Sequence, residues 1–174
     1  MKRLCLMRHA KSDWNHPELE DAQRTLNGRG VKSAEFLAGF IVEQGWAPDH
    51  ALCSTAVRAR STIKPLAEKL AGDCAIDYRD DLYMAMPATL LKAVQQLDDK
   101  NDTVLIVAHN PGLEMLAVEL SDAESGEASG RMADHFPTGA LAVFQFDVEK
   151  WSDVKKATGH VAFYGKPREL MQNS

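Results

Sequence analysis

The sequence predicts a three-layer α/β/α domain, with a mostly parallel central sheet of about six strands and crossover helices on both faces. Short apolar runs of strand length alternate along the chain with segments of helical periodicity, which is typical of this fold class. With 174 residues and 45% hydrophobic content, the chain can bury one substantial core. Because no internal repeat, low-complexity tract or domain linker interrupts it, we expect residues 1–174 to form a single domain.

The predicted strands are short and mostly apolar. The clearest is Thr103–Ala108, which is almost entirely β-branched or apolar, as a parallel strand buried on both faces should be. The last two runs fit an edge of the sheet. In chain order the predicted strands cover residues 2–7, 51–53, 75–78, 103–108, 141–146 and 160–164.

Helical periodicity fills the segments between these strands. The first predicted helix covers residues 30–44 and ends at Gly45, a favourable C-terminal cap. The second covers residues 56–70, where Pro65 should cost a hydrogen bond or introduce a kink. Residues 121–134 are small and polar without periodicity, so we expect a mobile loop there. Two further helices are predicted to open at Pro87 and Pro111.

Two histidines stand directly after predicted strands. Arg8 and His9 follow the first strand, and His109 follows the fourth. Asn110 is a good helix N-cap and Pro111 suits the first helical position, so His109 lies beside a helix N-terminus, which favours anions. Ligands of open α/β sheets bind at the carboxyl ends of the strands. The two matching positions therefore predict one shared anion site.

A third segment adds another cation to the predicted anion site. Ser54 or Thr55 can cap the helix that follows the second strand, and Arg58 then lies in its first turns. The helix macrodipole disfavours a cation there, unless the arginine faces a bound anion. Arg60 is the nearby alternative, and we expect it to be a surface residue.

Three motifs thus occur in order at strand ends: Arg8-His9-Ala10, Ser54-Thr-Ala-Val-Arg58-Ala-x-x-Thr62 and His109-Asn110-Pro111. Together they resemble the motifs of the histidine phosphatase superfamily, the phosphoglycerate mutase-like proteins. The chain has Thr55 where that family usually has proline, and Ala10-Lys11 where it usually has Gly followed by Glu. This variant, the short length and the segment Arg24-Thr-Leu-Asn-Gly28-Arg-Gly30 resemble the SixA-type branch, the phosphohistidine phosphatases. The resemblance extends from Lys2 to residue 165 or so.

The resemblance implies that His9 attacks phosphorus in line and that water then hydrolyses the phosphohistidine enzyme. A nucleophilic histidine must be neutral, and nearby arginines disfavour a further positive charge. Arg8, Arg58 and a protonated His109 would stabilise charge on the equatorial oxygens. We expect no metal and no cofactor, because a pocket of two arginines and two histidines repels a divalent ion and no metal-ligand spacing is present.

The general acid is the open question in the sequence. Superfamily members use a glutamate after the third strand, where this chain has Asp80 and Asp81. Asp81 is the better positional match, although both can be ordinary solvated loop acids. An ester leaving group needs a proton, whereas imidazole is a better leaving group. A substrate with a P–N bond could therefore dispense with a strong donor, which agrees with the SixA-type resemblance.

Several residues near the motifs have a functional and a plain interpretation. Asn15 matches a phosphate-contacting asparagine of the relatives, or is a simple loop residue. Ser12 contacts phosphate or only solvates the loop. For Lys11 we favour loop solvation, for Trp14 a packing or lid role, and for His135 a surface position. The remaining histidines carry no motif and are expected to be structural or exposed: His16, His50 and His160.

Composition excludes several classes of partner. A net charge of −5 and a pI near 5.7, without a basic run, argue against nucleic acid. No apolar run approaches membrane length, and the apolar start is too short for a signal peptide. The three cysteines, Cys5, Cys53 and Cys74, show no paired spacing, so we expect reduced thiols and a cytoplasmic location.

The resulting expectation is a phosphatase that dephosphorylates a phosphohistidine carrier protein. The segment between Thr62 and His109 has room for one strand and one helix without a large capping insertion, so the pocket should be open to a phosphate on another protein. The alternative is hydrolysis of a small phosphate ester. A non-catalytic phosphate-binding module ranks lower, because both histidines and both arginines are present. The oligomeric state is not determined by the sequence.

Overall fold

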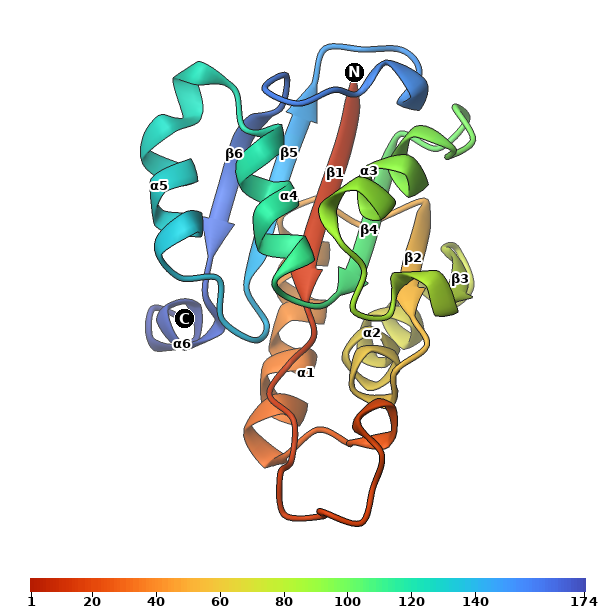
Figure 1. Ribbon diagram of the computed structural model, residues 1–174, viewed down its shortest axis with the longest axis vertical. Helices are drawn as coiled ribbons and strands as arrows, with labels where there is room; N and C mark the ends of the chain where they lie inside the picture. The colour runs from red at the N-terminus through yellow and green to blue at the C-terminus, as the bar shows by residue number, and fades with distance from the viewer.

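The centre of the molecule is a six-stranded sheet of order β3-β2-β4-β1-β5-β6, seen in the computed structural model, which describes all 174 residues (Figure 1). The parallel pairs are β1 with β4, β4 with β2 and β2 with β3, whereas β5 runs antiparallel to both β1 and β6. The prediction of a mostly parallel sheet with β6 at an edge is therefore confirmed. The strands are β1 (Lys2–Arg8), β2 (His50–Ser54), β3 (Ala75–Arg79), β4 (Thr103–Ala108), β5 (Leu141–Phe146) and β6 (His160–Gly165).

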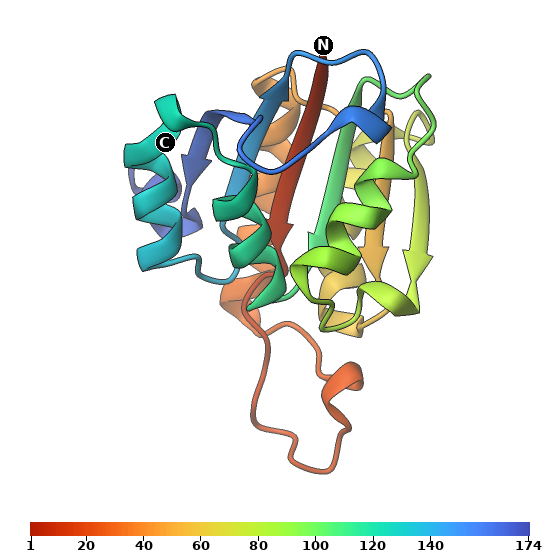
Figure 2. The same cartoon turned by 45° about the horizontal axis from the view of Figure 1, so that its top comes forward.

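Helices cover both faces of this sheet, which gives the predicted three layers (Figure 2). One face carries α1 (Gly28–Glu43), α2 (Val57–Leu70) and the short α6 (Pro167–Gln172). The other carries α3 (Pro87–Gln95), α4 (Gly112–Leu120) and α5 (Gly126–Asp134). None of these helices is both long enough and apolar enough to cross a membrane.

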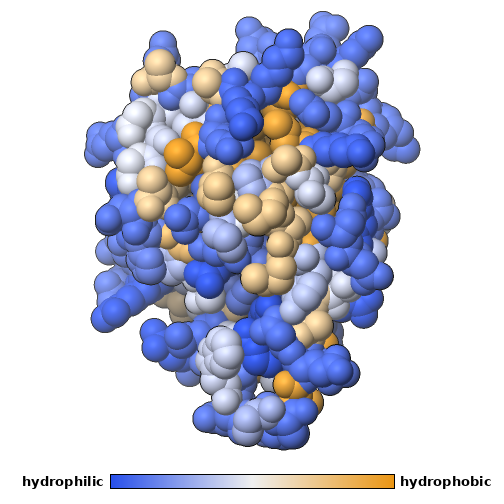
Figure 3. Space-filling model, viewed as in Figure 1, coloured by the Kyte–Doolittle hydropathy of each residue, from blue (hydrophilic) through white to orange (hydrophobic).

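Successive residues of the central strands contribute to two separate cores. In β1, Leu4 and Leu6 pack with α3, α4 and α5, whereas Cys5 and Met7 pack with α1 and α2. The residues of β4 alternate in the same way. Because side chains alternate across a strand, a strand covered by helices on both faces must be apolar throughout, as 103–108 is. Figure 3 shows the α3–α4 side, where apolar surface lies among polar side chains. Met86, the N-cap of α3, and Met115, in α4, are exposed.

The expectation of a mobile loop at residues 121–134 is wrong. The segment contains a short 3₁₀ turn (Ala123–Ser125) followed by α5. Asp122 caps the turn through Ser125, whose hydroxyl in turn accepts a hydrogen bond from the Val161 amide. Met132 is the one residue of α5 that is fully buried, and the helix packs against α4 and β6.

Helix ends differ from the prediction by one or two residues. The first helix begins at Gly28 rather than Gly30, because Asn27 caps it by accepting the amide of Gly30. The expected N-cap role of Asn110 is wrong, since α4 begins at Gly112 with Pro111 as its N-cap. The Asn110 amide instead donates to the Phe136 carbonyl at 2.8 Å. Helix α2 continues through Pro65.

The chain between β1 and α1 projects beyond the carboxyl edge of the sheet (Figures 1 and 2). It includes a 3₁₀ turn (Asp21–Gln23) that packs against α2. Strands β1, β2 and β4 all end at this edge, because they are mutually parallel. The fold therefore places the residues after these three strands, and the projecting segment, around one opening.

Candidate active site

A pocket of about 650 Å³ occupies this carboxyl edge. All four residues that the motifs single out for catalysis line it, although they come from positions up to a hundred residues apart. Other lining residues come from the projecting segment, from the chain that follows β3 and from the loop before β5. The lining residues are Arg8, His9, Lys11, Ser12, Trp14, Asp21, Arg24, Arg58, Tyr83, Met84, His109, Asn110, His135, Pro137 and Thr138.

His9 is held as a neutral imidazole with a defined tautomer. Its Nδ1 lies 2.8 Å from the Ala10 carbonyl oxygen, which can only accept, so Nδ1 carries the proton. Its Nε2 lone pair then accepts a hydrogen bond from Arg58 Nε at 3.3 Å. Burial lowers the pKa of His9 to about 3, and the neighbouring His109, Arg58 and Arg8 act in the same direction. The unprotonated Nε2 is the atom that a nucleophile requires.

Arg58 lies in the first turn of α2 with 2% of its surface exposed. Its Nη1 donates to the Asp21 carbonyl at 2.6 Å and its Nη2 to the Asp21 carboxylate at 2.9 Å. Thr62, one turn along the helix, donates to the Arg58 carbonyl and accepts the amide of Ala10. The Arg-x-x-x-Thr spacing therefore ties α2 to the chain that leaves β1, which sets Arg58 against His9.

His109 faces His9 at a ring-centroid distance of 5.1 Å. Its Nε2 lies 2.7 Å from the hydroxyl of Ser54, at the end of β2. Arg58 Nη2 approaches its Nδ1 at 3.4 Å, and an arginine can only donate, so Nδ1 carries the lone pair. Burial, and then the charge of Arg58, lower the pKa of His109 to about 4. A protonated His109 acting on a bound phosphoryl group stays a prediction, since the charge of a bound anion would raise this pKa.

Arg8, at the end of β1, also lines the pocket. Its Nη1 donates to the Phe136 carbonyl at 3.1 Å, whereas its Nε is buried without a hydrogen-bond partner. An unpaired buried donor is costly unless a ligand satisfies it. Burial lowers the pKa of Arg8, and the charge of Arg58 acts in the same direction. Arg8 and Arg58 thus bring two cations to one half-closed space.

Three further residues that line the pocket lie outside the three motifs. Asp21 is the one carboxylate among the lining residues, and the hydroxyl of Tyr83 donates a hydrogen bond to it. That hydrogen bond, with those from Arg58 and Arg24, lowers the pKa of Asp21 to about 2. Arg24 also donates to the Ser12 hydroxyl. Arg24 already stands in the segment 24–30 that resembles the SixA-type branch, whereas nothing in the sequence distinguishes Asp21 from its acidic neighbours.

Of the residues near the motifs that have both a functional and a plain interpretation, four line the pocket and Asn15 does not. Ser12 is buried and lines the pocket beside Arg24. Trp14 also lines it, with the Arg24 guanidinium 3.6 Å from its ring centroid. Lys11 and His135 are exposed but lie at the pocket mouth. Asn15 is exposed, does not line the pocket, and donates its amide to the Asp13 carboxylate.

The structure does not bring Asp81 into the pocket. Its exposed carboxylate pairs with Arg79 at 2.5 Å, and the Asp80 carboxylate accepts the hydroxyl of Thr55. The 3₁₀ turn of residues 80–82 buries Leu82 completely and directs Tyr83 and Met84, rather than either acid, to the pocket. The one carboxylate that lines the pocket is therefore that of Asp21, whose pKa is lowered to about 2.

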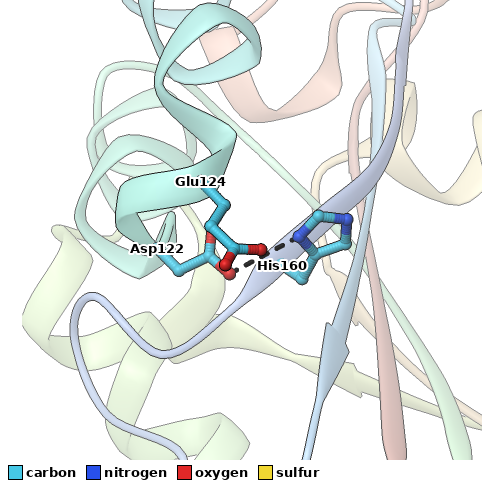
Figure 4. Close-up of side chains that lie close together, drawn as sticks. All are labelled: Asp122, Glu124 and His160. Atoms are coloured by element: carbon cyan, nitrogen blue, oxygen red, sulfur yellow. Dashed lines mark ion pairs between the residues drawn. The ribbon is translucent and has the colours of Figure 1, made fainter.

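One cluster of side chains has metal-ligand spacing, and it lies elsewhere. Asp122, Glu124 and His160 approach one another beside the start of β6 (Figure 4). His160 pairs with Gln145, which pairs with Arg3 near the start of β1, so the cluster lies at the opposite edge of the sheet from His9. Asp122 already caps the Ser125 turn. Metal independence of the pocket stays a prediction.

The geometry suits a tetrahedral oxyanion held between two guanidinium groups and in line with a neutral imidazole nitrogen. Comparisons with known proteins agree with this class of site. The profile of the histidine phosphatase superfamily (branch 1) matches residues 4–83. An uncharacterized protein of Mycobacterium tuberculosis (strain ATCC 25618 / H37Rv) is 32% identical over 165 residues, which make up 93% of this chain and 100% of that protein.

Two solved structures have the same fold over nearly their whole length. The proposed phosphohistidine phosphatase SixA of Nakamurella multipartitia has a TM-score of 0.83 at 26% identity, covering 95% of this chain and 96% of that one. The SixA protein of Agrobacterium tumefaciens, described in the same way, has a TM-score of 0.78 at 28% identity, covering 95% and 98%. The chain belongs to the histidine phosphatase superfamily, branch 1.

Proposed function

We propose that this protein is a phosphohistidine phosphatase that removes the phosphoryl group from a histidine of a carrier protein. The observation that carries the proposal is the state of His9, a neutral imidazole whose Nε2 lone pair meets Arg58 in a pocket that Arg8 also lines. The resemblance of the fold to SixA proteins supports the same substrate class.

In the first step, His9 Nε2 attacks phosphorus and the bond from phosphorus to the substrate imidazole breaks. The bonding electron pair stays on the departing nitrogen. If the other ring nitrogen carries a proton, the substrate leaves as neutral imidazole and needs no acid from the protein. Water then attacks phosphorus, the bond to Nε2 breaks, and phosphate leaves with the second water proton going to solvent.

The charged residues act on the transferring group. Arg8 and Arg58 hold its equatorial oxygens, and Arg58 exchanges its hydrogen bond to His9 Nε2 for one to phosphate. A bound dianion raises the pKa of His109, because an opposite charge favours the protonated form. His109 can then take up a proton at Nδ1 and donate it as a hydrogen bond to the phosphoryl group.

The lack of an acid donor favours the P–N substrate over a phosphate ester. Asp21 is the one carboxylate in the pocket, and it is ionised because Tyr83, Arg58 and Arg24 lower its pKa to about 2. An alkoxide leaving group would find no carboxylic proton there. Hydrolysis of small esters therefore remains the second candidate function.

The proposal is tested by measuring phosphate release in excess chelator from two substrates, a phosphohistidine carrier protein and an aryl phosphate. We expect strong preference for the P–N substrate, full activity in chelator and no activity in His9→Ala. Preference for the ester would leave His9 as the nucleophile but assign a small phosphate ester as the substrate. Full turnover by His9→Ala, or loss of activity in chelator, would contradict the mechanism.

A further inference from the structure

A second hollow of about 600 Å³ adjoins the catalytic pocket. The two share one wall, formed by Lys11, His135, Pro137 and Thr138. Beyond that wall the hollow extends between the first turns of α1 and α6. We call it the basic groove; its other lining residues are Arg29, Lys32, Ser33, Lys166, Pro167, Arg168, Glu169, Met171 and Gln172.

The basic groove concentrates positive charge on an acidic protein. Its lining holds five lysines and arginines against one carboxylate, that of Glu169, whereas the whole chain carries a net charge of −5. Glu169 lies 3.7 Å from Lys166 and 3.9 Å from Arg131, so it is already shared. The remaining cations form no ion pair within the protein: Lys11, Arg29, Lys32 and Arg168.

The presence of two of these cations at the start of α1 is not explained by the stability of that helix. Arg29 and Lys32 lie in the first two turns of α1, whose first turn has no acidic residue. The positive end of the helix macrodipole disfavours cations at that position, and an anionic ligand reverses the effect. The charge of the groove thus opposes local stability, as expected where a surface serves to bind anions.

The form of the groove favours a protein ligand over a second phosphate of a small molecule. Arg29, Lys32 and Arg168 are exposed, so they suit carboxylates spread over a partner surface rather than one fixed phosphate. Large apolar side chains are also exposed around the catalytic pocket, with Trp14 at 73% and Met84 at 46%. In the groove itself Met171 is 37% exposed beside the arginines, and methionine and arginine are both enriched where proteins contact one another.

We propose that the basic groove docks an acidic face of the phosphorylated carrier protein and so directs its phosphohistidine to His9. This inference rests on the proposed function, because it names the surface chemistry of the carrier. Long-range attraction between the two surfaces would speed association and make it sensitive to salt.

The test uses the whole chain with Lys32→Glu combined with Arg168→Glu, neither of which lines the catalytic pocket. The control is Lys155→Glu combined with Lys64→Glu, which changes the charge equally on exposed lysines outside the groove. The substrates are a histidine-phosphorylated phosphotransfer domain with acidic residues around its histidine, the same domain with those residues changed to amides, and phosphoimidazole. We expect the groove variant to lose about tenfold in kcat/KM on the acidic domain through KM, with a weaker salt dependence.

Phosphoimidazole turnover should be unchanged in the groove variant, and the amide-substituted domain should be a poor substrate for every form of the enzyme. Equal losses in the control variant, or unchanged activity on the acidic domain, would overturn the docking proposal while leaving the proposed function intact.

Binding of the unphosphorylated acidic domain, measured by calorimetry at low salt, separates the two proposals. If wild-type protein binds this domain and the groove variant does not, docking stands even where no P–N bond is hydrolysed. If wild-type protein hydrolyses the phosphorylated domain with no difference between variants in either assay, the function stands and docking fails.

Discussion

At the scale of single residues, the site depends on which nitrogen of each histidine is free. The Ala10 carbonyl sets the tautomer of His9, and Ser54 and Arg58 set that of His109. Both rings are neutral because burial disfavours their charged forms. The motifs contain both histidines and the three residues that orient them, but only the structure shows which ring nitrogen each of those residues engages.

Asp21 is the residue whose role is least expected from the sequence. Its carboxylate and carbonyl occupy two N–H donors of Arg58 that a phosphoryl group would otherwise use. It therefore neutralises part of the pocket before substrate binds.

We predict that Asp21→Asn tightens the binding of an oxyanion inhibitor by about fivefold, because removing a carboxylate beside Arg58 removes repulsion of roughly 1 kcal/mol at a partly exposed site. The measurement is the inhibition constant of vanadate. Glu20→Gln, the same change of charge on the neighbouring exposed residue, is the control and should have little effect. Weaker inhibition in Asp21→Asn would indicate that Asp21 instead holds Arg58 in its binding position.

At the scale of elements, the approach of α1 to the chain after β1 shapes the pocket. A Cβ built on Gly30 would lie 2.1 Å from the Lys11 carbonyl oxygen, so only glycine permits this approach. The same carbonyl accepts the amide of Asn27. Gly30, which belongs to the segment resembling the SixA-type branch, thus holds Lys11 and Ser12 at the pocket.

We predict that Gly30→Ala destabilises the protein by about 1–3 kcal/mol and lowers phosphatase activity, because the clash involves backbone that cannot move freely. Gly39→Ala is the matched control in the same helix, where the new methyl group meets nothing within 4 Å. It should raise stability by about 0.5–1 kcal/mol. Urea denaturation of both variants measures the difference, and a neutral Gly30→Ala would show that the contact is not tight.

Elements were predicted best where the apolar pattern is strong. Strand 103–108 and the helices after Pro87 and Pro111 were predicted because one or both of their faces enter a core. Helix α5 was missed because its sequence is mostly small and polar and Met132 is its one fully buried residue, although the helix packs against α4 and β6. Periodicity cannot reveal a helix that buries one side chain.

At the scale of the whole molecule, burying two neutral histidines makes stability depend on pH. The pKa of His9 falls to about 3 and that of His109 to about 4, whereas both lie near 6.5 in the unfolded chain. As pH falls below 6.5, the unfolded state takes up protons that the folded state does not. The free energy of unfolding therefore decreases with falling pH.

We predict that each of these histidines makes the free energy of unfolding fall by up to about 1.4 kcal/mol for each pH unit between about pH 6 and pH 4.5. Chemical denaturation at a series of pH values measures it. The double variant His9→Ala and His109→Ala should be less stable at neutral pH but show a flatter profile. An unchanged slope in that variant would mean that other groups cause the acid sensitivity.

The sequence by itself determined the fold class, the order of the strands along the chain and the four residues Arg8, His9, Arg58 and His109 as one group. It could do so because apolar periodicity and strand-end positions are local properties that parallel pairing then brings to one edge. Only the tertiary structure decided that Asp21, Tyr83 and Arg24 complete the pocket and that Asp81 stays outside it. Those outcomes depend on how a projecting segment and a short turn pack against distant helices, and side-chain contacts between distant segments leave no periodic pattern in the sequence.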